Sequence, residues 1–129
     1  MVAWLTDARN YWLCTARPDG PPHVKPVWAL WMDATLVFST SPESVSARHL
    51  RLEPRATVHL EGAHVAVVEG VVEPLAVAPH GFVEAYEAKY GWQMDPADPG
   101  TPLFVLRPRT VVSWDEGELA ATMTRWTFA

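Results

Sequence analysis

Proline interrupts this sequence at short intervals. Twelve of the 129 residues are Pro, and all of them fall between positions 18 and 108. Because Pro lacks a backbone N–H and fixes φ, it breaks helix interiors and is poorly tolerated in central strands. Long helices are therefore excluded, and with them helical bundles and coiled coils. The chain has to be built from short segments joined by turns.

Size and composition predict a single domain over residues 1–129. Apolar residues make up 49% of the chain and charged residues 19%, which is enough apolar surface for a packed core. The chain also contains 7 Trp residues. Trp is enriched at interfaces and ligand pockets, where its indole N–H finds a partner. We therefore expect part of this aromatic surface to serve binding.

Charge and cysteine content exclude several classes of partner. The net charge of −5 argues against binding to nucleic acids or anionic membranes. Residues 1–60 carry six basic and five acidic side chains, whereas residues 61–129 carry four and ten, so an anion site belongs in the first half. A single cysteine, Cys14, allows no internal disulfide and fits a reducing cytoplasm. No apolar run is long enough to span a membrane, so we expect a soluble, cytoplasmic protein.

No known catalytic or metal-binding motif is present in the sequence. The glycines show no G-x-G spacing, and neither H-E-x-x-H nor G-x-S-x-G occurs. His59 and His64 flank one predicted turn, but two imidazoles do not complete a metal site, and we expect no metal. Cys14 lies in an apolar strand and is interpreted as a structural thiol.

Strand patterns dominate and predict a small antiparallel barrel with short helices. Pro-Asp-Gly and Asp33 turns separate three strand-like stretches, which predict a three-strand meander. Gly70 interrupts an apolar run and predicts a bulge. The expected strands are 11–16, 23–32, 35–40, 55–60, 64–75, 103–106, 110–114 and 122–128, and the expected helices are 1–10, 41–53 and 80–91. Barrel closure would remove the exposed edges of such strands.

The segment around residues 38–55 contains the most informative chemistry. Ser41 is the predicted N-cap of a helix, with Pro42 at its first position. Backbone N–H groups and the helix dipole would meet several hydroxyls there, and Arg48 lies one turn beyond Ser44. These groups suit a phosphate. A capped surface helix with solvated Arg48 and Arg51 explains them equally well, so both interpretations stay open.

The order of these segments resembles the pyridoxamine 5'-phosphate oxidase-like split-barrel flavoproteins, a group that includes reductases using the deazaflavin coenzyme F-420. The resemblance rests on a Pro-Asp-Gly turn before the strand HVKPVW, a strand ending FST, and a helix followed by EPR. The segments VHLEG (residues 58–62), VVEGV (67–71) and TRWTF (124–128) extend it over nearly the whole chain.

The resemblance implies a mainly β, six-stranded antiparallel split barrel that forms a homodimer. FMN or coenzyme F-420 would lie in a groove between the subunits. The implied cofactor-binding residues are Lys25, Pro26, Val27 and Trp28 along the ring and ribityl chain, Ser39 and Thr40 at a strand end, Ser44, Ser46 and Arg48 at the phosphate, and Arg125 and Trp126, which would reach the partner's site.

The chain departs from the oxidase pattern at the phosphate. An Arg-Lys pair follows the helix-start Ser in that pattern, whereas this chain has Val45 and Ser46. Losing two such cations removes charge-assisted hydrogen bonds of about 1.5–3 kcal/mol each. We therefore expect the phosphate to bind more weakly than in the oxidase pattern. Lys25, Arg48 and the helix N-terminus remain to hold it. His49 also stands where many relatives carry Asn.

Two functions follow from these observations. The first is a flavin- or deazaflavin-dependent oxidoreductase that transfers hydride between the cofactor and a small planar substrate, with no residue assigned as acid or base. The second is a non-catalytic split barrel that binds a flavin, haem or other planar ligand; a purely structural dimer would leave the hydroxyl-rich helix start unexplained. Candidate pocket walls are Trp28, Trp31, Trp92 and Trp126.

Overall fold

The computed structural model of the protein describes residues 1–128. Strands predominate, and the helices are short. The strands are β1 (Tyr11–Thr15), β2 (His23–Val27), β3 (Ala29–Met32), β4 (Thr35–Ser39), β5 (Arg55–His59), β6 (His64–Leu75), β7 (Leu103–Asp115) and β8 (Thr124–Thr127). The helices are α1 (Val2–Asp7), α2 (Val45–Leu52), α3 (Phe82–Tyr90), the 3-10 turn η1 (Glu116–Glu118) and α4 (Leu119–Thr122).

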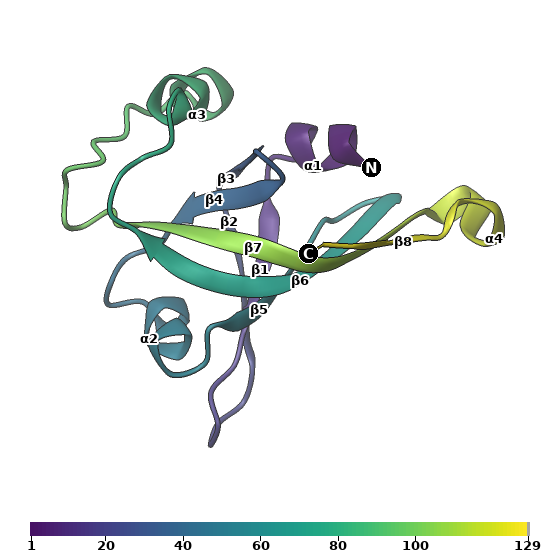
Figure 1. The fold of residues 1–129 in the computed structure, drawn as a ribbon, viewed down its shortest axis with the longest axis horizontal. Coiled ribbons are helices and arrows are strands. Elements are labelled where there is room, and N and C mark those ends of the chain that lie inside the picture. Colours follow the sequence, from purple (N-terminus) through teal and green to yellow (C-terminus); the bar gives the residue numbers. More distant parts are fainter. Residues whose placement is uncertain (129) are drawn as a thin grey trace.

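The strands form one antiparallel sheet that curls on itself. Its order is β2-β1-β5-β6-β7-β4-β3, and β8 pairs with β7 outside this path. The two end strands, β2 and β3, are separated in the chain by Trp28 alone. Both ends of the sheet therefore meet at this residue, which makes the sheet a half-barrel (Figure 1). The predicted mainly β split barrel is confirmed, with seven strands on the path rather than six.

The predicted three-strand meander over residues 11–40 is confirmed in its two hairpins, because β1 pairs with β2 and β3 pairs with β4, but its middle strand is not continuous. The stretch predicted as one strand, 23–32, is divided at Trp28, and β2 and β3 do not pair with each other. The backbone of Ala29 bonds instead to α3, because its N–H donates to the Tyr90 hydroxyl at 3.0 Å and its carbonyl lies 2.9 Å from the same oxygen.

The predicted hairpin around residues 107–109 is wrong, because β7 is continuous through Pro108. Gly70 of β6 lies opposite Pro108, and the register between the two strands shifts there. A Cβ atom on Gly70 would lie 2.3 Å from the Arg107 carbonyl oxygen. The bulge predicted at Gly70 is confirmed, and it accommodates the Pro that suggested a turn.

Two apolar clusters make up the core. The larger one fills the barrel and includes Leu13, Phe38, Val58 and Val111, all of them fully or almost fully buried. The second lies between α3 and strands β3, β4 and β7, where Phe82, Tyr86 and Tyr90 recur at helical spacing. This second cluster carries α3 as a separate layer, visible beside the barrel in Figure 1.

Candidate functional site

A chain of hydrogen bonds joins β2 and the end of β4 to the start of α2. The Lys25 ammonium donates to the Thr40 hydroxyl at 2.6 Å, and this hydroxyl lies 3.0 Å from that of Ser44. The Ser44 hydroxyl in turn accepts a bond of 3.1 Å from the backbone N–H of Ala47. Three of the residues predicted to bind the cofactor are thereby brought together. We refer to Lys25, Thr40 and Ser44 as the polar chain.

The N-cap of α2 is Ser44, not the predicted Ser41. Ser44 is extended, with φ −66° and ψ 158°, and its side chain caps the helix. Ser41 begins a turn instead, because its carbonyl accepts from the Ser44 N–H at 3.0 Å. Pro42 therefore precedes the helix rather than opening it. Because the N-cap is Ser44, the N-terminus of α2 lies directly at the polar chain.

The donor chemistry of the polar chain fits an anionic group. Lys25 is half-buried, and this burial lowers the pKa of its ammonium. An ammonium has three donors, and Thr40 uses one of them. The helix dipole and the free N–H groups of the first turn of α2 also favour negative charge. Val45, which replaces a cation of the oxidase pattern, adds no charge to this set.

The buried face of α2 holds the helix on the barrel. Ser46 has no exposed surface, and its hydroxyl lies 3.5 Å from His23 Nδ1. His49, also buried, lies 3.1 Å from the Thr15 hydroxyl and edge-on to His23. Ser46, predicted at the phosphate, thus faces the barrel here. His49, uninterpreted from the sequence, joins α2 to β1.

Arg48 lies on the exposed face of α2 and is not part of the polar chain. It borders a groove of about 410 Å³ between α2 and the β1–β2 turn. The groove is lined by Arg17, Pro21, Pro22, His23, Val45, Arg48, His49 and Leu52. The guanidinium groups of Arg17 and Arg48 therefore lie on the side of α2 next to β2, the strand that carries Lys25. They make this end of the barrel locally basic.

An aromatic pocket of about 380 Å³ opens on the other side of Thr40. We define it by its lining, which is Trp28, Ser39, Thr40, Ser41, Tyr86, Trp92, Met94, Gly100 and Thr101. Its wall is rigid at Trp28, because that ring stacks on Tyr90 at 4.6 Å and lies under the Arg9 guanidinium at 5.2 Å. Ser39 donates to the Pro102 carbonyl at 2.7 Å. Thr40 thus belongs to both the aromatic pocket and the polar chain.

The remaining predicted residues of β2 and β3 face other surroundings. Val27 is buried in the barrel core, and Pro26 is exposed on the edge strand opposite Trp12. Trp31 is half-buried and packs against the barrel core, so it does not line the aromatic pocket. Of the four Trp residues predicted as pocket walls, Trp28 and Trp92 line this pocket.

A lysine and two tyrosines connect α3 to the barrel. Lys89 donates to the Tyr11 hydroxyl at 2.8 Å and to the Thr6 carbonyl at 3.1 Å. Burial lowers the pKa of Lys89 to about 8 and raises the pKa of Tyr90 to about 12. Burial also raises the pKa of Tyr11, with the Tyr90 hydroxyl adding to this effect. The cluster orients α3 and so fixes the Tyr86 side of the aromatic pocket.

Arg125 and Trp126 lie on β8, within a C-terminal arm that we define as residues 116–128. Both side chains are exposed, and the Trp126 indole donates to the Ser113 hydroxyl at 3.4 Å. In Figure 1 α4 lies at the far end of β7, and β8 runs back along β7. This strand pairs with Thr110–Ser113, whereas Ser39, next to Thr40, pairs with Leu103 at the start of β7. One copy of the chain therefore does not bring Arg125 and Trp126 to the polar chain.

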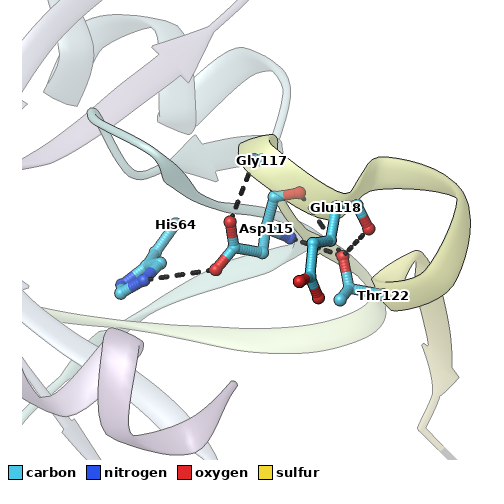
Figure 2. Close-up of polar contacts among 5 residues, drawn as sticks. All are labelled: His64, Asp115, Gly117, Glu118 and Thr122. Carbon is cyan, nitrogen blue, oxygen red and sulfur yellow. Dashed lines mark hydrogen bonds and ion pairs between the residues drawn. The ribbon is translucent and has the colours of Figure 1, made fainter.

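Asp115 fixes the root of this arm. Its carboxylate lies 3.5 Å from His64 Nε2 and accepts a 3.0 Å bond from the Gly117 N–H. Figure 2 shows both contacts. The backbone N–H of Asp115 donates to the Thr122 hydroxyl at 2.8 Å. Trp4 of α1 stacks on His64 at 4.4 Å, which connects the arm to the N-terminal helix. The direction of the arm is thus set by packed and bonded side chains.

Another cavity, of about 570 Å³, contains none of the residues predicted to bind the cofactor. It lies on the outer face of β1, β5 and β6 and is lined by Cys14, Thr15, Ala16, Pro22, Glu53, Arg55, Ala56, Thr57, Glu69, Gly70, Val71 and Arg109. The bulge at Gly70 was the one sequence signal for it. The Tyr86 and Met94 walls of the aromatic pocket were also missed, although the helical spacing of Phe82, Tyr86 and Tyr90 was visible.

Comparison with known families identifies the relatives of this chain. The sequence profile of the pyridoxamine 5'-phosphate oxidase family matches residues 1–115. The chain belongs to this family. The match covers every strand of the barrel path and includes the whole polar chain and the aromatic pocket. Among curated proteins, none matches the chain.

Several solved structures share the fold of this chain. A conserved hypothetical protein from Mycobacterium tuberculosis is 25% identical, with 92% of this chain and 84% of that chain covered and a TM-score of 0.71. An F-420 reductase is 23% identical, with 83% of this chain and 92% of that chain covered and a TM-score of 0.66. A heme binding protein from Mycobacterium smegmatis is 18% identical over 94% of this chain and 53% of that one, with a TM-score of 0.70.

The described residues also bear on membrane crossing and metal binding. In residues 1–128, none of the helices has the length and apolar character needed to cross a bilayer. The same residues contain no group of three or more His, Cys, Asp or Glu side chains placed to hold a metal ion.

Proposed function

We propose that the protein binds FMN or the deazaflavin coenzyme F-420 and acts as an oxidoreductase on a small planar substrate. The observation that carries this proposal is the position of Thr40, which joins a cationic polar chain to an aromatic pocket. A flavin has the same two parts, a phosphate and a planar ring, connected by a ribityl chain. Membership of the pyridoxamine 5'-phosphate oxidase family supports this assignment.

In this proposal the polar chain holds the phosphate. Lys25 supplies the charge, and the hydroxyls of Thr40 and Ser44 supply donors beside the first turn of α2. Arg48 adds long-range attraction from the exposed face of the helix. When bound, the cofactor would supply the hydride chemistry. Trp28 and its neighbours would then orient the reacting rings and exclude water from them.

We further propose that the working unit is a homodimer. Arg125 and Trp126 lie away from α2 within one chain, and the arm that carries them extends from the end of β7. A second copy would bring these side chains to the polar chain of its partner. Exposed apolar groups on the arm, including Leu119, Met123 and Trp126, support an interface there. The location that we propose is cytoplasmic.

A non-catalytic planar-ligand protein is the second candidate. It is favoured by Val45 and by the buried position of Ser46, which together leave the phosphate region without the basic pair of the oxidase pattern. One protein of the same fold is described as a heme binding protein. In this case the aromatic pocket would hold a planar ligand without turnover.

Titration of the purified protein with FMN and with coenzyme F-420 tests the proposal. We expect saturable quenching of cofactor fluorescence with one of the two, followed by oxidation or reduction of the bound cofactor when electron donors and acceptors are added. Saturable binding with no redox change in any acceptor tested would favour the second candidate. No saturable binding of either cofactor would contradict the oxidoreductase proposal.

A further inference from the structure

His64 lies at the point where the C-terminal arm leaves the barrel. It is the first residue of β6 and pairs in register with Asp115, the last residue of β7. Residues paired in this way have neighbouring side chains, and His64 Nε2 lies 3.5 Å from the Asp115 carboxylate (Figure 2). Neither the polar chain nor the aromatic pocket contains His64. The proposed function therefore gives this histidine no role.

The Asp115 carboxylate connects His64 to the arm. One of its oxygens accepts from the Gly117 N–H at 3.0 Å and caps η1, while the other faces His64. The backbone N–H of Asp115 donates to the Thr122 hydroxyl at 2.8 Å, and this hydroxyl donates to the Glu118 carbonyl at 2.7 Å. A change of charge on His64 thus acts on the residue that organises the first turns of the arm.

Carboxylates outnumber cations around His64. A cavity of about 430 Å³ lies beside it, between α1 and the β5–β6 turn, and is lined by Trp4, Asp7, Ala8, Arg9, Asn10, Leu60, Glu61 and His64. The charged groups near the imidazole are Asp115 from β7, Asp7 and Arg9 from the α1 side, Glu61 from the turn, and Glu116 and Glu118 from the arm. The single guanidinium of this set is directed to other rings, because it lies 5.2 Å from the centre of Trp28 and 5.5 Å from that of Tyr90.

Protonation changes how strongly His64 is held. A charged imidazole is attracted by the Asp115 carboxylate, whereas a neutral one has no such charge interaction. Trp4 of α1 stacks on the imidazole with ring centres 4.4 Å apart, and the face of an indole also attracts a cation. Histidine side chains change their charge between about pH 5 and pH 8. The contact between His64 and Asp115 is therefore stronger in mildly acidic solution.

We propose that His64 is a pH-dependent latch for the C-terminal arm. In mildly acidic solution the charged imidazole holds Asp115, and through it Gly117 and the start of the arm. In mildly alkaline solution the neutral imidazole gives up this hold, and the arm opens more often. The latch acts within one chain and does not rest on the proposed function. In a homodimer joined by the arm, it would make the dimer tighter at the lower pH.

Hydrogen exchange of the arm amides tests the latch. The unchanged protein and His64→Gln are compared at about pH 5.5 and again at about pH 8, so the intrinsic exchange rate cancels at each pH. We expect the arm to exchange faster in the variant, by a ratio about threefold larger at the lower pH, because an exposed ion pair contributes modestly. The same ratio at both pH values would overturn the proposal.

Two further variants identify the partner of His64. Asp115→Asn removes the charge and keeps an oxygen that can cap η1. In this background His64→Gln should have the same effect at both pH values, and an effect that still depends on pH would overturn the assignment of Asp115. His59→Gln is the matched control, because His59 flanks the same turn and stacks on Trp12 at 6.2 Å, but its Nδ1 lies 3.2 Å from the Leu60 carbonyl. A pH-dependent effect of equal size in this control would also overturn the latch.

Sedimentation equilibrium at the same two pH values separates the latch from the proposed homodimer. If His64→Gln has its pH-dependent effect but the protein is a monomer at both pH values, the latch stands and the homodimer fails. If the protein is a dimer and the effect of His64→Gln does not depend on pH, only the latch fails.

Discussion

At the scale of single residues, Thr40 connects the two parts of the candidate site. Its hydroxyl accepts from Lys25 and contacts Ser44, and its residue also borders the aromatic pocket. A hydroxyl can occupy this position because it both donates and accepts. Thr40 is buried, so these bonds form in a region of low dielectric where they are stronger than at the surface.

Thr40→Val keeps the shape of this side chain and removes its hydroxyl. We expect cofactor affinity to fall about tenfold, because a hydrogen bond to a charged group is worth about 1.5–3 kcal/mol. Fluorescence titration with FMN or coenzyme F-420 measures the change. Thr35→Val is the control, since its hydroxyl bonds to the Met32 carbonyl in the β3–β4 turn. An equal loss in both variants would contradict the role of Thr40.

Gly70→Ala tests the bulge between β6 and β7. The added Cβ would meet the Arg107 carbonyl oxygen at 2.3 Å and its carbon at 2.9 Å, both of them backbone atoms that cannot turn away. We expect the free energy of unfolding to fall by about 1–3 kcal/mol in urea denaturation. Gly117→Ala is the control, because its nearest neighbour is a side-chain oxygen of Asp115 at 3.5 Å. Equal stability of the two variants would contradict the close approach.

At the scale of elements, α3 is held by groups that titrate above neutral pH. The pKa of Lys89 is about 8, against an ordinary value of 10.5. Between these values the unfolded chain binds more protons than the folded one, so the free energy of unfolding rises with pH. The pKa of Tyr90 is about 12, against 10.0, so above pH 10 the folded protein holds more protons and stability falls.

We therefore expect the stability of the protein to rise from pH 8 to about pH 10 and to decrease above it. Lys89→Met should make the rise smaller, leaving the contribution of Lys25, whose pKa is also lowered, and should leave the decrease, as measured by urea denaturation at several pH values. The difference in free energy of unfolding between the two proteins, followed against pH, isolates the contribution of Lys89 from that of the other titrating groups. A rise that persists unchanged in Lys89→Met would contradict the buried position of this ammonium.

The elements also show what could be predicted from sequence. Strand patterns and turn residues predicted β4, β5, β6 and α3 closely, because alternation and Gly-containing turns are local signals. The division at Trp28 could not be predicted, since it depends on Tyr90, far away in the chain, bonding to Ala29. A turn was predicted at Pro108 because nothing near it in the sequence indicates that a strand can accommodate this Pro. The bulge that accommodates it is formed at Gly70, on another strand.

The candidate site was predictable to a similar degree. Ser44 and Lys25 were identified through a family resemblance, and the structure joins them through Thr40. The orientation of Ser46 toward His23 depends on how α2 packs, which single-residue patterns do not specify. The Tyr86 wall of the aromatic pocket depends likewise on the docking of α3. Long-range packing, rather than local propensity, decides which side chains face a ligand.

At the scale of the whole molecule, the arm is paired with the barrel through β8 and β7 but carries several exposed apolar side chains. These side chains are Leu119, Met123 and Trp126, and Figure 1 shows α4 beyond the end of the barrel. We expect sedimentation equilibrium to give twice the chain mass of 14.4 kDa. Trp126→Ala should weaken the dimer at least tenfold, whereas Trp92→Ala, at the aromatic pocket, should leave it intact. A monomer at all concentrations would contradict the proposed homodimer.

The central claim is that the polar chain holds the phosphate of a flavin-type cofactor, and a comparison of FMN with riboflavin tests it most directly. Riboflavin has the same ring and ribityl chain but no phosphate. We expect the protein to bind FMN at least tenfold more tightly than riboflavin, and Lys25→Met to lose most of this preference, because the Lys25 charge acts on the phosphate alone while the hydroxyls and the first turn of α2 remain. A preference for FMN that survives undiminished in Lys25→Met would contradict the claim.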